Sequence, residues 1–350
     1  MFEQISLPIL ALIFAAAAAV VWIAGVYVSK TTDVLSSRFH LGEALGGAIL
    51  LAIVTNLPEI AITISGALHN QLEIATGNIL GGIAIQTVVL VLLDVATRKR
   101  APLIGHAASL ELVLEAALVI VMLTMTVLAH QLPESLVWRG ITPDGLLILG
   151  MWVAGLYLIG KARGNLPWQG HGDAPGGQTR RTVQQKKEKT VAQESSTAWA
   201  IAIFLVAATA TLAAGVVLQQ TGETIAKQLG LSGVIFGATI LAAITALPEI
   251  STGLAAIKMA DYRLAISDIF GGNAFLPVIF LGATLVSGKA VLPHATKSDM
   301  YLTALGMLLT AIYIYGLIFR PRRQVARMGI DSFVVVIVYL IGIAGLFAIK

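Results

Sequence analysis

The stretch Thr-Asn-Leu-Pro-Glu-Ile at residues 55–60 recurs as Thr-Ala-Leu-Pro-Glu-Ile at residues 245–250. An ungapped alignment of residues 47–91 with residues 237–281 gives 15 identities in 45 positions. Each copy places a proline and a glutamate inside an otherwise apolar run. An ionised carboxylate costs several kcal/mol in apolar surroundings, so two of them in equivalent places indicate a cation-binding site.

The composition is typical of a chain that lies largely within a lipid bilayer. Hydrophobic residues make up 57% of the 350 positions, charged residues only 12%, and the mean hydropathy is +0.86. A soluble domain carries about 25% charged residues, roughly twice as many. The first apolar run, residues 7–28, is long enough to span a bilayer and lacks the basic start of a secretory signal, so we interpret it as a retained helix. Because the chain has no cysteine, disulfides and cysteine-based zinc sites are excluded.

The apolar runs predict an all-α integral membrane protein with ten transmembrane helices. They cover approximately residues 7–28, 42–67, 75–96, 109–130, 145–161, 198–219, 233–257, 264–287, 299–319 and 331–349. Five helices per half make the second half cross the membrane in the opposite sense. We therefore expect two inverted five-helix repeats, residues 1–163 and 198–350, joined by a basic cytoplasmic linker at 164–197. The alternative is a duplication that preserves only a packing motif, which the paired glycines would suit.

The distribution of lysine and arginine predicts the orientation. If the N-terminus is outside, the inside loops carry 18 of the 23 basic residues and the outside loops carry 5. Cytoplasmic loops are enriched in basic residues, so both termini are expected outside, in a membrane of the bacterial inner (plasma) membrane type. Basic residues in short loops report orientation and do not indicate nucleic-acid binding.

The two glutamates are the main candidate ligands. Pro58 and Pro248 cannot donate a backbone hydrogen bond, so each helix should kink or break just before its glutamate. A break frees carbonyls in the preceding turn, and together with the carboxylates these are oxygen ligands for a hard cation. The alternative for a single copy is a plain proline kink whose glutamate bonds to a neighbouring helix. The candidate metal ligands of these two spans are Glu59, Glu249, Thr55, Thr245, Ala52 and Ala242.

The third and eighth spans add polar side chains. Asn78 and Gln86 lie on one helix face, and Asp268 occupies the repeat position of Asn78. We expect all three near the glutamates, although the two amides would also serve as hydrogen bonds between helices. Glu43 and Asp94 lie close to span ends, and we interpret both as interfacial. Since no HExxH, G-x-S-x-G or P-loop pattern occurs, we expect no enzyme activity and no cofactor.

These motifs resemble the alpha-repeats of the calcium/cation antiporter superfamily, which includes the sodium/calcium exchangers. The family pattern joins a T-S-L-P-E helix to a G-N-x-x-G-S-N-type helix, twice, in ten spans. The resemblance implies alternating-access exchange of Ca2+ against Na+ or H+, with the lipid bilayer and inorganic cations as partners. It implies Glu59 and Glu249 as central ligands, oxygens from Thr55 and Thr245, and flanking carbonyls from Ala52 and Ala242.

The chain departs from the family pattern where that family forms its Na+ sites. Serines of the pattern are replaced by Asn56 and Ala246 and by Gly82 and Gly272, and Leu276 stands where the first repeat has Gln86. Fewer oxygens weaken the case for Na+, while crowded carboxylates in a low dielectric favour proton uptake when the cation leaves. The sequence therefore predicts a Ca2+ antiporter that exchanges Ca2+ for Na+ or H+, and it favours H+ coupling or a mixed ion preference. A monovalent cation/H+ antiporter, a channel and a degenerate exchanger remain alternatives.

Overall fold

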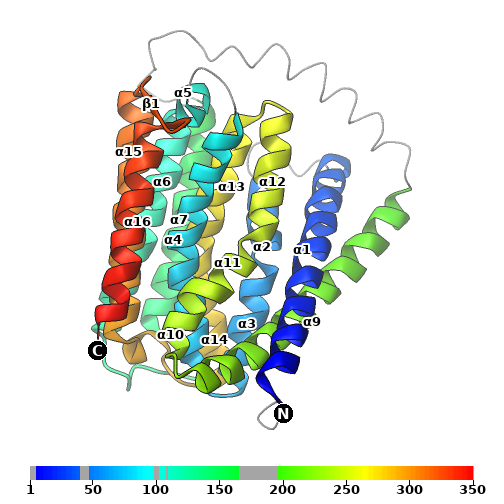
Figure 1. The fold of residues 1–350 in the computed structure, drawn as a ribbon, viewed down its shortest axis with the longest axis vertical. Coiled ribbons are helices and arrows are strands. Elements are labelled where there is room, and N and C mark those ends of the chain that lie inside the picture. Colours follow the sequence, from blue (N-terminus) through cyan, green and yellow to red (C-terminus); the bar gives the residue numbers. More distant parts are fainter. Residues whose placement is uncertain (1–4, 40–46, 98–101, 108, 165–195, 350) are drawn as a thin grey trace.

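The computed structural model describes residues 5–39, 47–97, 102–107, 109–164 and 196–349, which form one bundle of helices (Figure 1). The first half consists of α1 (Leu7–Arg38), α2 (Gly47–Thr55), α3 (Leu57–Leu68), α4 (Leu72–Thr97), α5 (Leu103–Ala107), α6 (Leu110–His130) and α7 (Pro143–Gly164). The second half consists of α9 (Thr197–Leu229), α10 (Gly233–Phe236), the π-helical η2 (Gly237–Leu241), α11 (Ala242–Thr245), α12 (Leu247–Lys258), α13 (Tyr262–Phe275), the 3-10 turn η3 (Leu276–Val278), α14 (Ile279–Ser287), η4 (Leu292–His294), α15 (Lys297–Phe319), β1 (Gln324–Val325), β2 (Met328–Gly329) and α16 (Ile330–Ala348).

The ten predicted spans are confirmed. In the part of the chain that the structure describes, nine continuous helical segments are long and apolar enough to cross a membrane. The second predicted span is instead divided into α2 and the shorter apolar helix α3. Helices α1 and α9 extend to 32 and 33 residues, well beyond the predicted 22, and lie against each other. No sequence pattern indicated the small antiparallel pair β1–β2. Most of the predicted linker lies outside the described residues.

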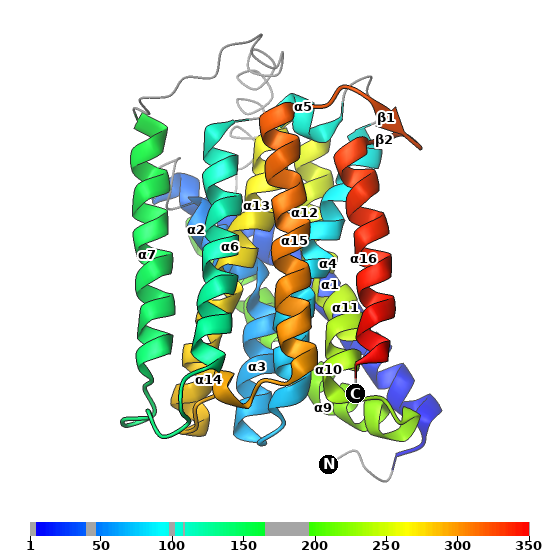
Figure 2. The same ribbon diagram turned by 90° about the vertical axis from the view of Figure 1, so that its left-hand side faces the viewer.

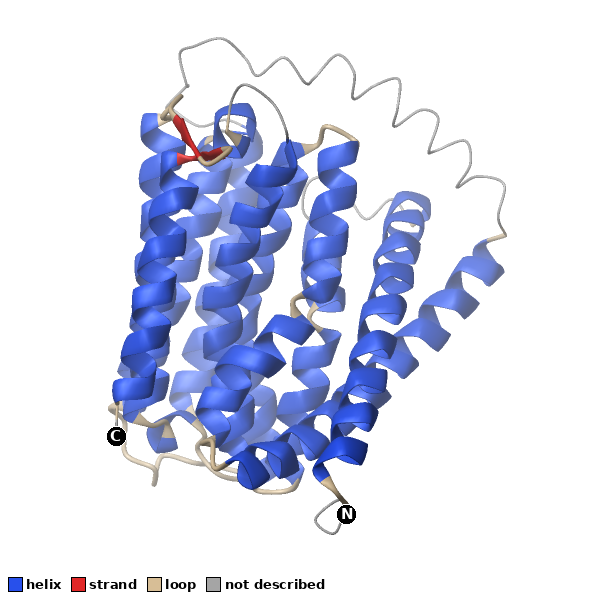
Figure 3. Ribbon diagram, viewed as in Figure 1, coloured by secondary structure: helices blue, strands red, loops and turns tan. Residues whose placement is uncertain are grey.

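The two halves run through the bundle in opposite senses. Helix α1 starts at the end of the bundle where α16 finishes (Figures 1 and 2). Helix α7 finishes at the opposite end, where α9 begins, and we call this the linker end. The broken spans α2–α3 and α10–α12 therefore cross the bundle antiparallel to each other. Their non-helical breaks lie midway along the bundle (Figure 3).

Glycines bring the two repeats into backbone contact. A Cβ at Gly77 of α4 would lie 2.5 Å from the carbonyl oxygen of Val234, and one at Gly81 would collide with the backbone of Ala238. Small residues permit such close approach, which replaces the hydrophobic driving force that helices lack in lipid. The centre of the protein is thus a tight contact between α4 of one repeat and the α10–η2 segment of the other.

The long helices α1 and α9 also pack across the repeats. Gly25 of α1 lies against the ring of Pro248, where an added Cβ would come within 2.8 Å of the ring Cγ. Gly215 of α9 lies against the backbone of Pro58, where an added Cβ would come within 3.1 Å of the carbonyl oxygen. The two glycines are separated by the same 190 positions as the two LPEI segments. Each long helix therefore supports the proline break of the opposite repeat.

This packing predicts that Gly215→Ala destabilises the protein. The added methyl group meets the Cβ of Ala61 at 2.6 Å and the backbone of Pro58, which cannot move without disturbing the break. Overpacking of this kind costs about 1–3 kcal/mol, so we expect a lower Tm for the detergent-solubilised variant. The control is Gly150→Ala in α7, where a Cβ meets nothing within 4 Å. An equal Tm for both variants would contradict the proposed contact.

Candidate cation-binding site

The two LPEI segments form equivalent breaks in the middle of the bundle. Asn56 separates α2 from α3, and Ala246 separates α11 from α12. In each case the proline occupies the second position of the new helix and the glutamate its first turn. Proline is well tolerated in the first turn, where its missing N–H has no helical partner. The predicted breaks are confirmed, and both glutamates lie at the positive end of a helix dipole.

The carboxylates of Glu59 and Glu249 are buried, with exposed fractions of 0% and 1%. One oxygen of Glu59 accepts a hydrogen bond of 3.4 Å from the amide nitrogen of Gln86. The other oxygen of Glu59 and both oxygens of Glu249 have no hydrogen-bond partner. A buried, unpaired carboxylate is costly while it is ionised, so each glutamate requires a cation or a proton. The observation disfavours a plain kink with a satisfied glutamate.

Each glutamate also has a threonine of the opposite repeat as a neighbour. Thr245 faces Glu59, and Thr55 faces Glu249. Both hydroxyls also bond backward to their own helices, Thr55 to the carbonyl of Leu51 at 3.1 Å and Thr245 to that of Ala242 at 3.3 Å. Such bonds turn the oxygen lone pairs outward. The inverted repeats thus place the two breaks face to face.

Helix α4 supplies both predicted amides. Asn78 is fully buried and its side-chain oxygen accepts a 3.4 Å hydrogen bond from Thr245, while Gln86 reaches Glu59. The nitrogen of Asn78 and the oxygen of Gln86 have no partner. Gly272 of α13 leaves room for the Asn56 amide beside Gln86, because a Cβ there would lie 2.9 Å from the Asn56 side-chain nitrogen and 3.6 Å from the Gln86 side-chain oxygen. The structure therefore brings both amides to the glutamates, and their role as cation ligands stays a prediction.

The predicted carbonyl ligands are already hydrogen-bonded. The Ala52 carbonyl accepts a 2.6 Å bond from the side chain of Asn56, and the Ala242 carbonyl accepts a 3.1 Å bond from the backbone N–H of Ala246. A carbonyl oxygen has a second lone pair. Here that lone pair is also engaged, at 3.3 Å by the Thr245 hydroxyl on Ala242 and at 3.4 Å by the Thr55 hydroxyl on Ala52. Coordination by either carbonyl would displace the threonine hydroxyl, and this too stays a prediction.

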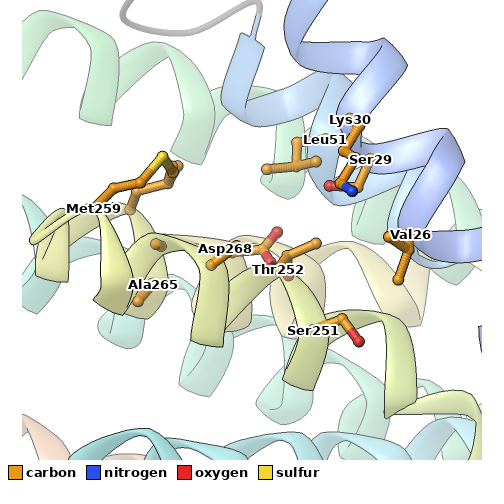
Figure 4. A pocket seen from close by; sticks show the side chains of 12 residues that line it. Val26, Ser29, Lys30, Leu51, Ser251, Thr252, Met259, Ala265 and Asp268 are labelled. Atoms are coloured by element: carbon orange, nitrogen blue, oxygen red, sulfur yellow. Dashed lines mark hydrogen bonds between the residues drawn. The ribbon is translucent and has the colours of Figure 1, made fainter. Parts of the chain in front are cut away.

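Asp268 lies beside the glutamates in a separate environment. Glu249 is within its electrostatic reach, but the Asp268 carboxylate accepts a 2.6 Å hydrogen bond from Thr252 and its other oxygen has no partner. Asp268 lines a cavity of about 70 Å³ between α1, α12 and α13 (Figure 4). Lys30 and Ser29 of α1 and Ser251 of α12 also line this cavity. The third carboxylate is thus at the side of the glutamate pair that faces the cavity.

The sequence did not single out three further polar residues near the site. Asn56 and Asn273 are fully buried, each with an unpartnered side-chain oxygen, and Thr252 holds Asp268. Comparison of the repeats concealed Asn273 and Thr252, because their equivalents are apolar. Asn56 and Asn273 could have been found in the sequence, because each is a polar residue inside an apolar run, Asn56 within the LPEI segment's break and Asn273 directly after the paired glycines. Within the described ranges, no three His, Asp or Glu side chains cluster as a metal site, so any cation must also use amides, hydroxyls and carbonyls.

Inverted repeats that meet at broken helices near the membrane midplane, with buried carboxylates at the breaks, define a class of secondary transporters. The comparison with known families agrees. The family model described as sodium/calcium exchanger protein matches residues 9–161 and 199–348. The chain belongs to this family, and it is a multi-pass integral membrane protein.

Individual relatives are distant but span nearly the whole chain. The inner membrane protein YrbG of Escherichia coli (strain K12) is 24% identical over 87% of this chain and 88% of its own. The putative antiporter CaxA of Alkalimonas amylolytica is 26% identical over 80% and 82%. Among solved structures, the H+/Ca2+ exchanger CAX matches with a TM-score of 0.63 at 13% identity, covering 97% of this chain and 88% of that one. The sodium-calcium exchanger NCX_Mj matches with 0.59 at 17% identity, covering 96% and 98%. These structural matches show a shared fold.

The geometry predicts that Gln86→Leu weakens cation binding. The change removes the hydrogen bond that the Gln86 amide donates to the Glu59 carboxylate and reproduces the apolar residue of the second repeat. Such a bond contributes about 1 kcal/mol, so Ca2+ affinity measured by equilibrium dialysis should fall roughly fivefold. The matched control is Gln219→Leu, a fully buried glutamine that bonds Ser65 and Gln71 instead. Equal affinity in the two variants would remove Gln86 from the site.

Proposed function

We propose that the protein is a secondary active antiporter that exchanges Ca2+ for H+ across the membrane by alternating access. The observation that carries this proposal is the buried pair Glu59 and Glu249, which have three of their four carboxylate oxygens unpartnered. A divalent cation neutralises both carboxylates at once, and one proton on each does the same. Only one of the two can occupy the site at a time, and this competition is what exchange requires.

The polar groups around the glutamates favour H+ over Na+ as the counter-ion. Na+ needs its own set of oxygen ligands, whereas a proton needs only the carboxylate. Gly82, Gly272 and Leu276 provide no side-chain oxygen at the positions where the family pattern has polar groups. In the structure, a Cβ at Gly82 would lie 3.9 Å from a methyl carbon of Leu276, so this contact between α4 and η3 is apolar.

The cavity beside Asp268 supports access to the site from the linker end. Its walls include the C-terminal half of α1 and helix α12, and both of these helices run toward the linker end (Figures 1 and 4). Ser251 and Thr252 are two and three residues beyond Glu249. An ion entering here would meet Asp268 before it reaches the glutamates. We infer that access from the other end requires the repeats to move relative to each other.

The orientation and the division into repeats follow the same proposal. The linker end carries most of the lysine and arginine residues of the loops, which favours the cytoplasmic side for it. Residues 1–163 and 198–350 would then act as two bodies that rock about the glutamate pair, connected by residues 164–197.

A monovalent cation/H+ antiporter is the second candidate. It is favoured by the small number of carboxylates at the glutamate pair, because Ca2+ takes six to eight oxygen ligands. The same reconstituted vesicles, loaded with Na+ or K+ in place of Ca2+, test this candidate directly.

The central prediction concerns radioactive Ca2+ uptake into proteoliposomes. With a pH gradient imposed, the wild-type protein should accumulate Ca2+ against its gradient, and Glu59→Gln combined with Glu249→Gln should abolish uptake because neither carboxylate can then bind Ca2+ or a proton. A Na+ gradient without a pH gradient should drive little uptake. The control is Glu134→Gln, which removes an exposed carboxylate outside the bundle and should retain full activity.

Three results would contradict the proposal in different ways. Uptake that depends on Na+ and ignores the pH gradient would replace the coupling ion. Flux down the Ca2+ gradient with no counter-ion demand would indicate a channel. Uptake that survives the double substitution would show that the glutamate pair is not the transport site.

A further inference from the structure

A second pair of buried carboxylates lies at the linker end, remote in sequence from the LPEI segments. Asp94 near the end of α4 is 2% exposed, so the expectation that it is interfacial is wrong. Its oxygens accept hydrogen bonds of 2.7 Å from the backbone N–H of Leu103, the backbone N–H of Gly329 and the hydroxyl of Ser332. The chain folds back over Asp94 with donors in place, and these donors offset the cost of burying the carboxylate. The other residue given the same expectation, Glu43, lies outside the described residues.

The second carboxylate belongs to Asp331, in the first turn of α16. Asp331 is 5% exposed, and neither of its oxygens has a hydrogen-bond partner. Arg322 and Arg323 before β1 and Arg327 in the β1–β2 turn are exposed, and among the described residues no ion pair with Asp331 or Asp94 is formed. A helix N-terminus favours a negative charge. The backbone N–H groups of Asp331 and Ser332 lie close to these oxygens but form no well-aligned hydrogen bond with them.

The two carboxylates converge on one point. A Cβ built on Gly329 would collide with an oxygen of Asp331 and lie 3.3 Å from an oxygen of Asp94. Gly329 therefore leaves room that both side chains share. The hydroxyl of Ser332 lies between Asp94 and the buried hydroxyl of Tyr313, at 2.7 Å and 3.3 Å. Carboxylates and hydroxyls are oxygen ligands of the type that hard divalent cations prefer.

The opposite end of the bundle lacks this arrangement. Asp144 has the position in the first turn of α7 that Asp331 has in α16, and it is also buried. The residue equivalent to Asp94 is Thr284, whose hydroxyl bonds to its own helix at 2.9 Å. A single carboxylate there stands in place of a pair. The acid pair is thus specific to the linker end and does not follow from the repeat.

We propose that Asp94 and Asp331 form a second cation site, which binds a divalent cation such as Ca2+ between α4 and α16. Asp331 would supply its two unpartnered oxygens, Asp94 a remaining lone pair, and Ser332 and Tyr313 their hydroxyls. The site connects a helix of the first repeat with a helix of the second. Cation occupancy at the linker end would therefore stabilise one relative position of the repeats and regulate exchange. Binding at this site does not depend on the proposed transport function.

The competing explanation is purely structural. Asp94 would then hold the 102–103 and 328–330 segments in place, and Asp331 would carry a proton. Both explanations predict that loss of Asp94 harms folding, so Asp94 is not the residue to change. Substitution of Asp331 distinguishes the two explanations, because its oxygens hold no other segment of the chain in place through a hydrogen bond.

The experiment measures radioactive Ca2+ binding by equilibrium dialysis, without any gradient, on detergent-purified protein carrying Glu59→Gln and Glu249→Gln. This background removes the candidate transport site. We expect one Ca2+ per chain to remain bound. Addition of Asp331→Asn should weaken that binding roughly tenfold or more, because the charge of the ligands sets Ca2+ affinity. The matched control is Asp144→Asn, which should leave it unchanged. If Asp331→Asn does not fold, Ser332→Ala is measured in the same background and should weaken binding about threefold.

The proposal is overturned if the double-glutamine background binds no Ca2+. It is also overturned if Asp331→Asn, as a folded and monodisperse protein, binds Ca2+ as tightly as its parent, or if Asp144→Asn weakens binding equally. None of these results bears on Ca2+/H+ exchange by the wild-type protein, which the vesicle experiment decides separately.

Discussion

The arrangement of the whole molecule depends on a proline that precedes a glutamate in the middle of a membrane-spanning helix. Proline removes a backbone donor and ends the helix, and the new helix that begins there points its positive end at the glutamate. In lipid no water is present to repair such a break, so irregular backbone must be enclosed by protein. The long helices α1 and α9 provide this enclosure, with Gly25 against Pro248 and Gly215 against Pro58. The break that creates the site also dictates what must pack around it.

As a consequence, each repeat supports the proline break of the other. Each proline break is covered by a helix of the other repeat, and each glutamate faces a threonine of the other repeat, Thr245 for Glu59 and Thr55 for Glu249. Helix α4 reaches across as well, through Asn78. Neither repeat can therefore complete its own half of the site. A shift of one repeat against the other changes the surroundings of both carboxylates together, which is the property that coupled exchange needs.

The sequence was sufficient for the span count, the breaks and the burial of the two glutamates beside them, because these depend on local rules. Apolar length sets the spans, proline sets the breaks, and the repeated motif identifies the glutamates. It was less informative where tertiary contacts decide. The position of Asp94 near the end of a span suggests an interfacial residue, yet donors from Leu103, Gly329 and Ser332, which no sequence pattern connects with it, enclose its carboxylate. Asn273 was hidden because its repeat equivalent, Ile83, is apolar. A functional residue that occurs in only one repeat does not stand out when the two repeats are compared.

The differences between the repeats follow a physical logic of their own. If the two halves were identical, the states open to either side would have the same energy, and nothing in the protein would distinguish the directions. The halves differ through a π-helical segment before the second break, through Asp268 in place of Asn78, and through the Asp94–Asp331 pair, which joins the repeats at the linker end and has no equivalent pair at the opposite end. All three differences affect charge or backbone pairing in buried positions, where each carries a large free energy. Symmetry thus creates the opposed glutamates, and the departures from symmetry are where this chain can set the relative free energies of the two opposed states.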